Sequence, residues 1–390
     1  MGFLQVNDIE LILAGITGVM LLIQLLYYFS LYFRIHYRNA QVSRRGSQFT
    51  EDLPPISIII YTDEQCEQLK RSLPLILAQD YPAGFEVVII NGSKTDETED
   101  YLKLMQREHE NIYHSFLPDS SRYFSRKKLA ITLAMRACKH DWVLMTEPGC
   151  VPASDQWLRL MASNCTPRTE IILGYSGYTH AKGWRNRMIS FDNLLLSMRY
   201  LGAALSGSPY MGIGKNLLYR KELFYKDKGF TWQHDLQRGD DDLFVNRLAN
   251  GRNTRVETDS RAAMVSDTPT PKEWKDEKTG FAITAHRYKG TQHYLMGFET
   301  TTRLVFYLSL LAMKWEALFS GHYIFIGVAA LAWLVRWVFQ CMVFNITAKD
   351  LNMHRRFYLS LPLFDFIQPW QSLRWKLRSL NKHKHDFLWQ

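Results

Sequence analysis

The chain has 390 residues, of which 47% are hydrophobic, and it carries a formal net charge of +9 at pH 7. This length exceeds what one ordinary core needs, and two soluble domains would be one way to divide it. The apolar residues instead gather near the two ends, which argues against an even division. The basic residues lie beside these apolar stretches, as in the run Arg374 to His385, and no nucleic-acid-binding motif is recognised. We therefore predict no nucleic-acid partner and an attraction to anionic lipid headgroups.

Three apolar stretches predict helices that cross a lipid bilayer. Residues 9–33 form the first, in which Glu10 is the one charged residue. A secretory signal peptide would have a basic start and a shorter apolar core, so we interpret this stretch as a retained anchor. Residues 303–320 and 322–345 predict a transmembrane hairpin. Arg336 lies inside the third stretch, where an ionisable side chain normally faces protein or water.

Basic residues predict which side of the bilayer each segment faces. They follow the first and the third stretch, whereas the outer ends of the stretches carry few Lys or Arg. The prediction is an outer N-terminus at 1–8, a basic linker at 34–53, a cytosolic domain at 54–295, and a basic cytosolic and interfacial tail at 346–390. In a reducing cytosol the five cysteines, which show no metal-ligand spacing, are expected to be free thiols.

Short β-branched runs alternate with helical patterns after Pro54. The run Ile56 to Tyr61 is typical of a buried parallel strand. Such alternation indicates an α/β fold whose sheet is covered on both faces and binds ligands at the carboxyl ends of its strands. The predicted strands are 56–61, 85–90, 112–116, 142–146 and 170–175, and the predicted helices are 66–79, 95–109, 127–139, 154–165, 186–205 and 241–249.

Six segments in this order resemble motifs of the family 2 glycosyltransferases, especially the membrane-anchored bacterial group. They are PPISIIIYTDEQ from Pro54, LAQDYP from Leu77, VVIINGSKTDET from Val87, SRKKLAI from Ser125, GIGKNLLYRKELF from Gly212 and GDDDLFVNRLA from Gly239. The resemblance covers about Pro54 to Tyr294. It implies a nucleotide-diphospho-sugar transferase (GT-A-like) domain with a mixed, mainly parallel sheet, a nucleotide-sugar as donor substrate, and a place in the bacterial inner membrane.

The acidic cluster Asp240, Asp241 and Asp242 is the predicted catalytic group. Inverting sugar transfer needs a carboxylate that deprotonates the acceptor hydroxyl, and neighbouring carboxylates raise one another's pKa. The resemblance makes Asp240 the first choice for this base and Asp241 the second. Acidic residues are also common at helix N-termini because the helix dipole favours them, and that alternative accounts for one or two of the three.

The resemblance places the donor on residues that follow the strands. The family's Asp-x-Asp motif, which holds a divalent metal against the diphosphate, corresponds here to Glu147, Pro148 and Gly149. One carboxylate is too few for Mg²⁺ or Mn²⁺ unless other residues complete the site, and a lysine ammonium can neutralise a diphosphate instead. The predicted donor-binding residues are Asp63, Asn91, Lys127, Lys128 and Glu147, with Glu147 as the predicted metal ligand. Helix capping is the alternative role of Asp63, and ordinary helix-surface charge that of the lysines.

Two further family residues are missing. Gly92 stands where the family has an aspartate that binds the base, and the late Gln-x-x-Arg-Trp motif corresponds to Glu277, Gly280 and Phe281, without its arginine. On the acceptor side we predict Asn216, Glu277 and Lys278. A glycine-flanked asparagine can also simply adopt left-handed backbone angles.

Two hypotheses follow. The first is an inverting glycosyltransferase that moves a sugar from a nucleotide-sugar to a membrane lipid or lipid-linked acceptor in envelope polysaccharide or glycolipid synthesis. The second is a degenerate, non-catalytic scaffold or regulatory subunit of an envelope assembly, which the altered donor motifs motivate. The intact acidic cluster favours the enzyme, because a scaffold has no chemical reason to keep it.

Overall fold

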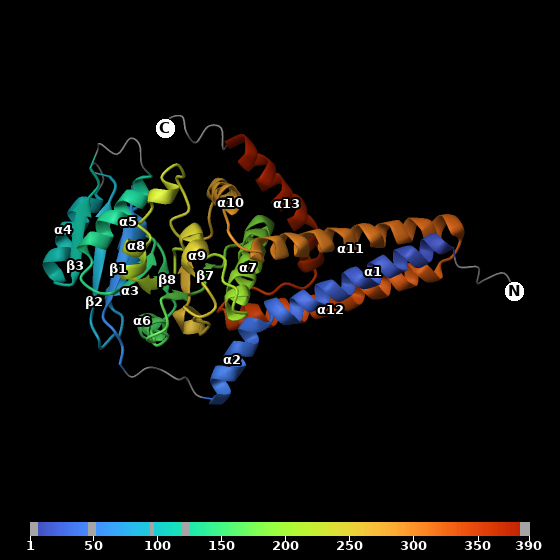
Figure 1. Ribbon diagram of the computed structural model, residues 1–390, viewed down its shortest axis with the longest axis horizontal. Coiled ribbons are helices and arrows are strands. Elements are labelled where there is room, and N and C mark those ends of the chain that lie inside the picture. Colours follow the sequence, from blue (N-terminus) through green and yellow to red (C-terminus); the bar gives the residue numbers. More distant parts are fainter. Residues whose placement is uncertain (1–6, 46–51, 94–96, 119–124, 383–390) are drawn as a thin grey trace.

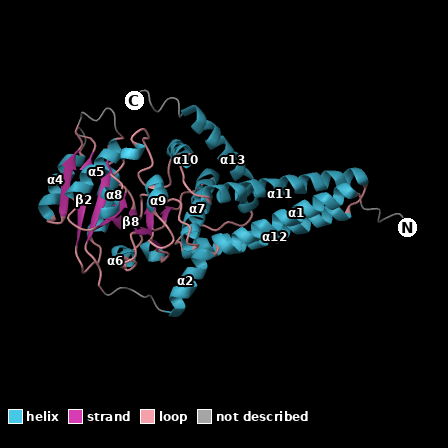
Figure 2. Cartoon of the chain, in the orientation of Figure 1, coloured by secondary structure: helices cyan, strands magenta, loops and turns pink. Residues whose placement is uncertain are grey.

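The computed structural model describes residues 7–45, 52–93, 97–118 and 125–382, so parts of the predicted N-terminus, linker and tail, and the first two residues of the helix predicted at 95–109, lie outside it. An α/β domain occupies one end of the molecule, and three long helices project from it side by side (Figure 1). Strands are confined to the α/β domain (Figure 2). The five cysteines are free thiols, as predicted.

A seven-stranded sheet in the order β3-β2-β1-β4-β8-β6-β9 forms the centre of the domain. Its first four strands pair in parallel, β8 pairs antiparallel with β4 and β6, and β6 pairs in parallel with β9. The predicted mixed, mainly parallel sheet is therefore confirmed. The strands are β1 (Ile56–Thr62), β2 (Phe85–Asn91), β3 (Ile112–Phe116), β4 (Trp142–Thr146), β6 (Ile171–Leu173), β8 (Leu217–Arg220) and β9 (Thr254–Val256).

Successive side chains of β1 enter two different cores, as the two-residue period of a strand requires. Ile58 and Ile60 pack in one core and Ile59 in the other, and all three are almost fully buried. The core around Ile58 also contains residues of α3 (Cys66–Leu77), α4 (Thr98–Glu108) and α6 (Trp157–Ala162). The core around Ile59 contains residues of α5 (Arg126–Ala137), α7 (Trp184–Leu205), α8 (Lys221–Lys226) and α9 (Asp242–Leu248). Helices thus cover both faces of the sheet.

Short strands and one helix complete the domain. A second sheet has the order β5-β10-β7, from β5 (Val151–Pro152), β7 (Ser176–Tyr178) and β10 (Met264–Ser266). Helix α10 (Pro271–Ala285) begins with a capping box between Thr270 and Glu273. Helix α10 contains Glu277, Gly280 and Phe281, which were matched to the family's late Gln-x-x-Arg-Trp motif.

The projecting helices contain the three predicted spans. The first lies in α1 (Asp8–Tyr27) and the π-helical turn Tyr28–Tyr32, and α2 (Arg34–Arg45) continues it into the predicted linker. The others lie in α11 (Gln292–Ser320) and α12 (Ile324–Asp350). By length and composition, two of the described helices could cross a membrane: Asp8–Arg44 and Ile324–Asp350. Helix α11 is less apolar because it carries Lys314 and Glu316.

Helix α13 (Ser360–Lys382) connects the projecting helices with the α/β domain (Figure 1). It contains two prolines: Pro362 lies in the first turn, where the missing N–H has no helical partner, and Pro369 lies inside the helix. Its first half packs on α11 and its second half on α10, where the rings of Trp375 and Trp274 lie 5.5 Å apart.

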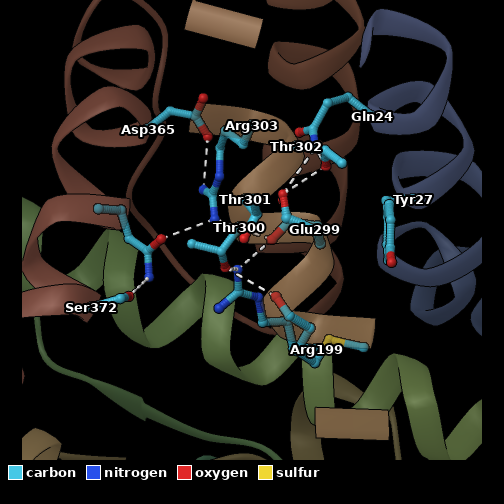
Figure 3. Close-up of polar contacts among 12 residues, drawn as sticks. Gln24, Tyr27, Arg199, Glu299, Thr300, Thr301, Thr302, Arg303, Asp365 and Ser372 are labelled. Carbon is cyan, nitrogen blue, oxygen red and sulfur yellow. Dashed lines mark hydrogen bonds and ion pairs between the residues drawn. The ribbon is translucent and has the colours of Figure 1, made fainter. Parts of the chain in front are cut away.

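A buried polar cluster joins α13 to the bundle, and we call it the bundle cluster: Gln24, Arg199, Glu299, Arg303, Arg336 and Asp365. Arg303 lies between Asp365 of α13 and Glu299 of its own helix (Figure 3), with N···O distances of 3.0 and 3.1 Å. Arg336 binds the other Asp365 oxygen at 2.7 Å and donates to Gln24 of α1. Arg199 of α7 pairs with Glu299. The arginine predicted inside the third span therefore faces protein.

Gly202 marks the closest approach of α7 to the anchor helix. A Cβ at this position would lie 2.4 Å from the backbone oxygen of Leu31, which cannot move without distorting the π-helical turn. Although alanine favours a helix by about 1 kcal/mol over glycine, we expect Gly202→Ala to lower the free energy of unfolding by about 1–3 kcal/mol through overpacking. Thermal unfolding in detergent measures this.

Gly297→Ala in α11 is the matched control, because nothing lies within 4 Å of the added Cβ. We expect it to leave stability unchanged or slightly raised. Equal melting temperatures for both variants would contradict the close approach at Gly202.

Candidate active site

A cleft of about 1750 Å³ opens at the carboxyl end of β1 and β4, where the fold predicts a ligand. The loops after β4 and before α5 and α9 line one wall, and α10 lines another. Of the predicted site residues, the cleft brings together Lys127, Glu147, Asp240, Asp241, Asp242 and Glu277. Asp63, Asn91, Lys128, Asn216 and Lys278 are not in its lining.

The three aspartates precede and begin α9, and each has a different environment. Asp240 is 4% exposed, and one of its oxygens lies 3.0 Å from Lys127 Nζ. Asp241 caps the helix, accepts a hydrogen bond of 2.7 Å from Gly214 N–H, and lines the cleft. Asp242 is buried and accepts hydrogen bonds from Thr284 and Tyr288 near the end of α10. The third aspartate thus anchors α10, and the first two are the ones available to the cleft.

These different environments change the pKa values of the aspartates. Burial, together with the negative charges of Asp240 and Asp242, raises the pKa of Asp241 to about 7, although Lys127 opposes the rise. Burial also raises the pKa of Asp242, although its hydroxyl donors oppose this. A carboxyl group with a pKa near 7 can accept a proton at neutral pH.

Lys127 lies between Glu147 and Asp240. Its Nζ is 2.8 Å from Glu147 and 3.0 Å from Asp240. Burial would lower the pKa of Lys127, but Asp240 and Glu147 hold it well above its usual value. The pKa of Glu147 falls to about 2, because Lys127 and Lys215 outweigh its burial. The lysine and Glu147 are therefore both charged at neutral pH.

The polar groups of Lys128 and Asn216 form hydrogen bonds within the fold. Lys128 is fully buried, and its Nζ donates to the carbonyls of Gln233 and Leu236 at 2.8 and 2.7 Å. Asn216 is 1% exposed, accepts from Trp157 Nε1, and donates to two backbone carbonyls. Both side chains hold loops around the cleft rather than facing it.

The predicted nucleotide loop has a carboxylate beside Gly92. A Cβ at Gly92 would lie 2.9 Å from Asp63 Cγ and 2.8 Å from the Tyr61 hydroxyl, which donates to Asp63. Asp63 is also 3.8 Å from Arg126 of the cleft wall. Asn91 is buried, accepts from Ser93 N–H, and has a side-chain N–H group without a partner among the described residues. The space that a side chain at position 92 would need is thus filled by Asp63 and Tyr61.

The α10 wall holds a second charged group, Glu277, opposite Lys215. Lys215 Nζ lies 3.7 Å from Glu277 and 5.2 Å from the centre of the Tyr178 ring. Tyr178 and Glu277 raise the pKa of Lys215 well above its usual value against the effect of burial. Lys278 points away from the cleft and pairs with Asp192 at 2.7 Å.

The sequence analysis missed four basic residues of the cleft: Arg71, Arg126, Lys215 and Arg238. The last three lie inside or next to one of the six motif segments, so the basic residues near those segments could have indicated them. Arg238 covers Gly280, where an added Cβ would lie 2.3 Å from Arg238 Cδ and 2.7 Å from Nε. A guanidinium therefore lies over the position from which the family's arginine is missing.

The residues present do not fit a divalent metal at the predicted place. A Mg²⁺ ion needs oxygen ligands at about 2.1 Å, and the ammonium of Lys127 fills the space between Glu147 and Asp240. Pro148 and Gly149 offer no side-chain ligand. Among the described residues, Cys66, Glu67 and Glu97 lie close enough to hold an ion, but they are outside the cleft lining and both glutamates bind Lys70.

Part of the chain matches a known protein family. Residues 57–227 match the model of glycosyl transferase family 2, and the match ends before the acidic cluster. No curated protein sequence matches the chain.

One solved structure with a TM-score above 0.5 has the same fold. The mannosyltransferase PcManGT from Pyrobaculum calidifontis, solved with GDP-Man and Mn²⁺, is similar at 16% identity and a TM-score of 0.55, over 89% of this chain and 99% of that one. TarS from S. aureus, solved with UDP-GlcNAc, is 14% identical with a TM-score of 0.42, over 82% and 91%. The segment from residue 57 to residue 227 is a glycosyl transferase family 2 domain with a GT-A-like fold, and this domain identifies the chain as a glycosyltransferase.

Proposed function

We propose that the protein is an inverting glycosyltransferase that moves a sugar from a nucleotide-sugar to a membrane-associated acceptor in envelope polysaccharide or glycolipid synthesis. The observation that carries the proposal is the pairing of a base and a cation in one cleft. Asp241, with a pKa near 7 and a place in the cleft lining, can deprotonate an acceptor hydroxyl. Lys127 on the same wall can stabilise the leaving diphosphate.

The base is Asp241 in this proposal, although the resemblance put Asp240 first. Asp240 is 4% exposed and already paired with Lys127, which leaves its oxygens poorly placed to receive a proton from an acceptor. Asp241 lines the cleft and has no lysine or arginine partner among the ion pairs of the described residues. Asp240 then positions Lys127.

Two neighbouring side chains supply charges that the altered motifs lack. Asp63 lies over Gly92, and Arg238 lies over Gly280. A carboxylate and a guanidinium are therefore present at the two places where the matched family positions have lost them. This weakens the case for a degenerate scaffold, which rested in part on those two losses.

The outward-facing surface of the three projecting helices supports membrane insertion. Of the most apolar windows of the two candidate spans, 17% and 22% of the residues are buried, unlike the core helix of a soluble protein. Large apolar side chains are exposed along the bundle: Ile12, Val19 and Leu22 on α1, Leu308, Leu311 and Trp315 on α11, and Leu331, Leu334 and Val338 on α12. An exposed apolar surface of this extent fits lipid. The basic helix α2 supports a cytosolic α/β domain at a bacterial inner membrane.

The direct test is transfer from a panel of radiolabelled nucleotide-sugars to a bacterial lipid extract by the purified chain in detergent. We expect one donor to give a labelled lipid with inverted anomeric configuration. Binding of no nucleoside diphosphate and transfer from no donor would overturn the proposal and leave the scaffold.

Asp63→Ala tests the replacement of the nucleotide-loop carboxylate. We expect the Kd for the preferred nucleoside diphosphate to rise about tenfold, which corresponds to one charge-assisted hydrogen bond. Isothermal titration calorimetry measures it. Asp80→Ala removes the same charge from a side chain that contacts Gln156 and Arg159 instead of the nucleotide loop, and it should leave the Kd unchanged. An unchanged Kd in Asp63→Ala would exclude Asp63 from the nucleotide site.

A further inference from the structure

The position of one lysine bears on how the donor diphosphate is held. Lys127 is the second residue of α5, whose first turn Ser125 caps, and its side chain is about one third exposed to the cleft. Its Nζ is held by one carboxylate from the loop after β4 and one from the start of α9. Three separate segments thus fix one positive charge at the carboxyl end of the sheet.

Two carboxylates that converge on one point can contribute oxygen ligands to a hard divalent cation. Here their facing oxygens lie 2.8 and 3.0 Å from the ammonium, which are ordinary distances for a charged hydrogen bond and too long for a metal bond. A metal placed between them would meet Nζ itself and be repelled by its charge. Lysine and metal therefore compete for one place.

A diphosphate bound in this cleft needs a nearby cation, because the lining is acidic. Acidic side chains outnumber basic ones along its lining. Four other cations lie in the same lining, but Lys215 is paired with Glu277, Arg126 contacts Asp63, Arg71 is paired with Asp267, and Arg238 lies over Gly280 of α10. The charge between Glu147 and Asp240 is the one placed beside the candidate base.

We infer that the Lys127 ammonium takes the place of a divalent metal, so that the donor diphosphate binds without Mg²⁺ or Mn²⁺. This inference rests on the proposed function for the identity of the ligand. Glu147 and Asp240 are positioning residues for Lys127 rather than metal ligands. Removing the lysine leaves two carboxylates facing one another, and that vacancy should recruit a metal.

The first arm of the test uses the wild-type chain and a panel of nucleoside diphosphates in calorimetry. With EDTA or with Mn²⁺, we expect the Kd of the preferred nucleotide to agree within about twofold. A rise of about tenfold or more in EDTA, reversed by Mn²⁺, would overturn the inference. This arm needs no variant, so a failure of any variant to fold does not affect it.

The second arm measures Mn²⁺ alone by electron paramagnetic resonance and needs no nucleotide. Wild type should not bind the ion at the cleft, Lys127→Met should gain binding, and Lys127→Met with Glu147→Gln should lose it again. Lys103→Met breaks a surface pair with Glu99 and is the matched control for the charge change. Mn²⁺ binding by wild type that Glu147→Gln removes, or no gain in folded Lys127→Met, would overturn the inference. If no nucleotide binds in the first arm, the proposed function fails while this arm still decides the role of Lys127.

Discussion

Asp241→Asn is expected to lower kcat about 1000-fold, within the range that general-base catalysis contributes. The amide keeps the size of the side chain, and its one oxygen can still accept the hydrogen bond from either Gly214 N–H or Asp242 N–H, but it cannot take a proton from the acceptor hydroxyl. The nucleotide Kd should stay within about threefold of wild type, since the base does not hold the donor. Initial rates with the preferred donor and calorimetry of its nucleoside diphosphate separate the two quantities.

Asp240→Asn is the matched control, because it removes the same charge one residue earlier. It takes one of two carboxylate partners from Lys127, so the nucleotide Kd should change while a substantial kcat remains. The reverse pattern, with kcat lost in Asp240→Asn and kept in Asp241→Asn, would assign the base to Asp240.

The pH dependence gives Asp241 an independent signature. A base whose pKa in the folded protein is about 7 is half protonated there, so kcat/KM should rise with pH and level off above about 8. Stability should move the other way: the folded-state pKa lies above the unfolded value, so this contribution is full at low pH and is lost as pH rises through about 7. Asp241→Asn should flatten this fall in the melting temperature near neutral pH.

The local sequence was sufficient to predict much of the secondary structure of the α/β domain. The predicted strands at 56–61, 85–90, 112–116 and 142–146 agree with β1 to β4 within a residue. The runs of β1, β2 and β4 are buried on both faces, so their continuous apolar sequence alone indicates a strand, whereas β3 is only partly buried. Strands β8, β9 and β10 have three or four residues, and their pairing partners are far away in the chain, so no periodicity could indicate them. The segment of β8 lies in the motif GIGKNLLYRKELF, for which no strand was predicted.

The sequence predicted which residue types form the site, but it did not predict which of these residues contact one another. Resemblance pointed to the aspartates, Lys127 and Glu147, but only the fold shows that the lysine lies between two carboxylates. The glycines at 92 and 280 looked like losses because a sequence does not show that Asp63 and Arg238 fill the space beside them. Asn216 shows the converse: its amide is fully bonded to Trp157 and two carbonyls, which no local pattern could reveal.

Asp365→Ala should lower the free energy of unfolding more than Gly202→Ala does. The two Asp365 oxygens accept from Arg303, Arg336 and Tyr307, at 3.0, 2.7 and 2.7 Å, and both arginines are at most 2% exposed. Removing the carboxylate leaves buried guanidinium groups in excess, and breaking one buried pair already costs about 3–5 kcal/mol. Reversible unfolding in mixed micelles measures the loss. Asp350→Ala breaks a partly exposed pair with His36 and should cost less than about 1 kcal/mol.

Asp365→Ala should also affect the cleft, because α13 connects the bundle cluster with α10. Asp365 fixes the first half of α13 to the bundle, and Trp375 in its second half packs on Trp274 of α10, whose Glu277 and Gly280 line the cleft. Asp365→Ala should therefore weaken nucleotide binding at temperatures where the chain is still folded, whereas Asp350→Ala should not. A destabilised variant with an unchanged nucleotide Kd would mean that α10 is held by the α/β domain itself, through Thr284, Tyr288 and Asp242, and that the bundle cluster serves stability alone.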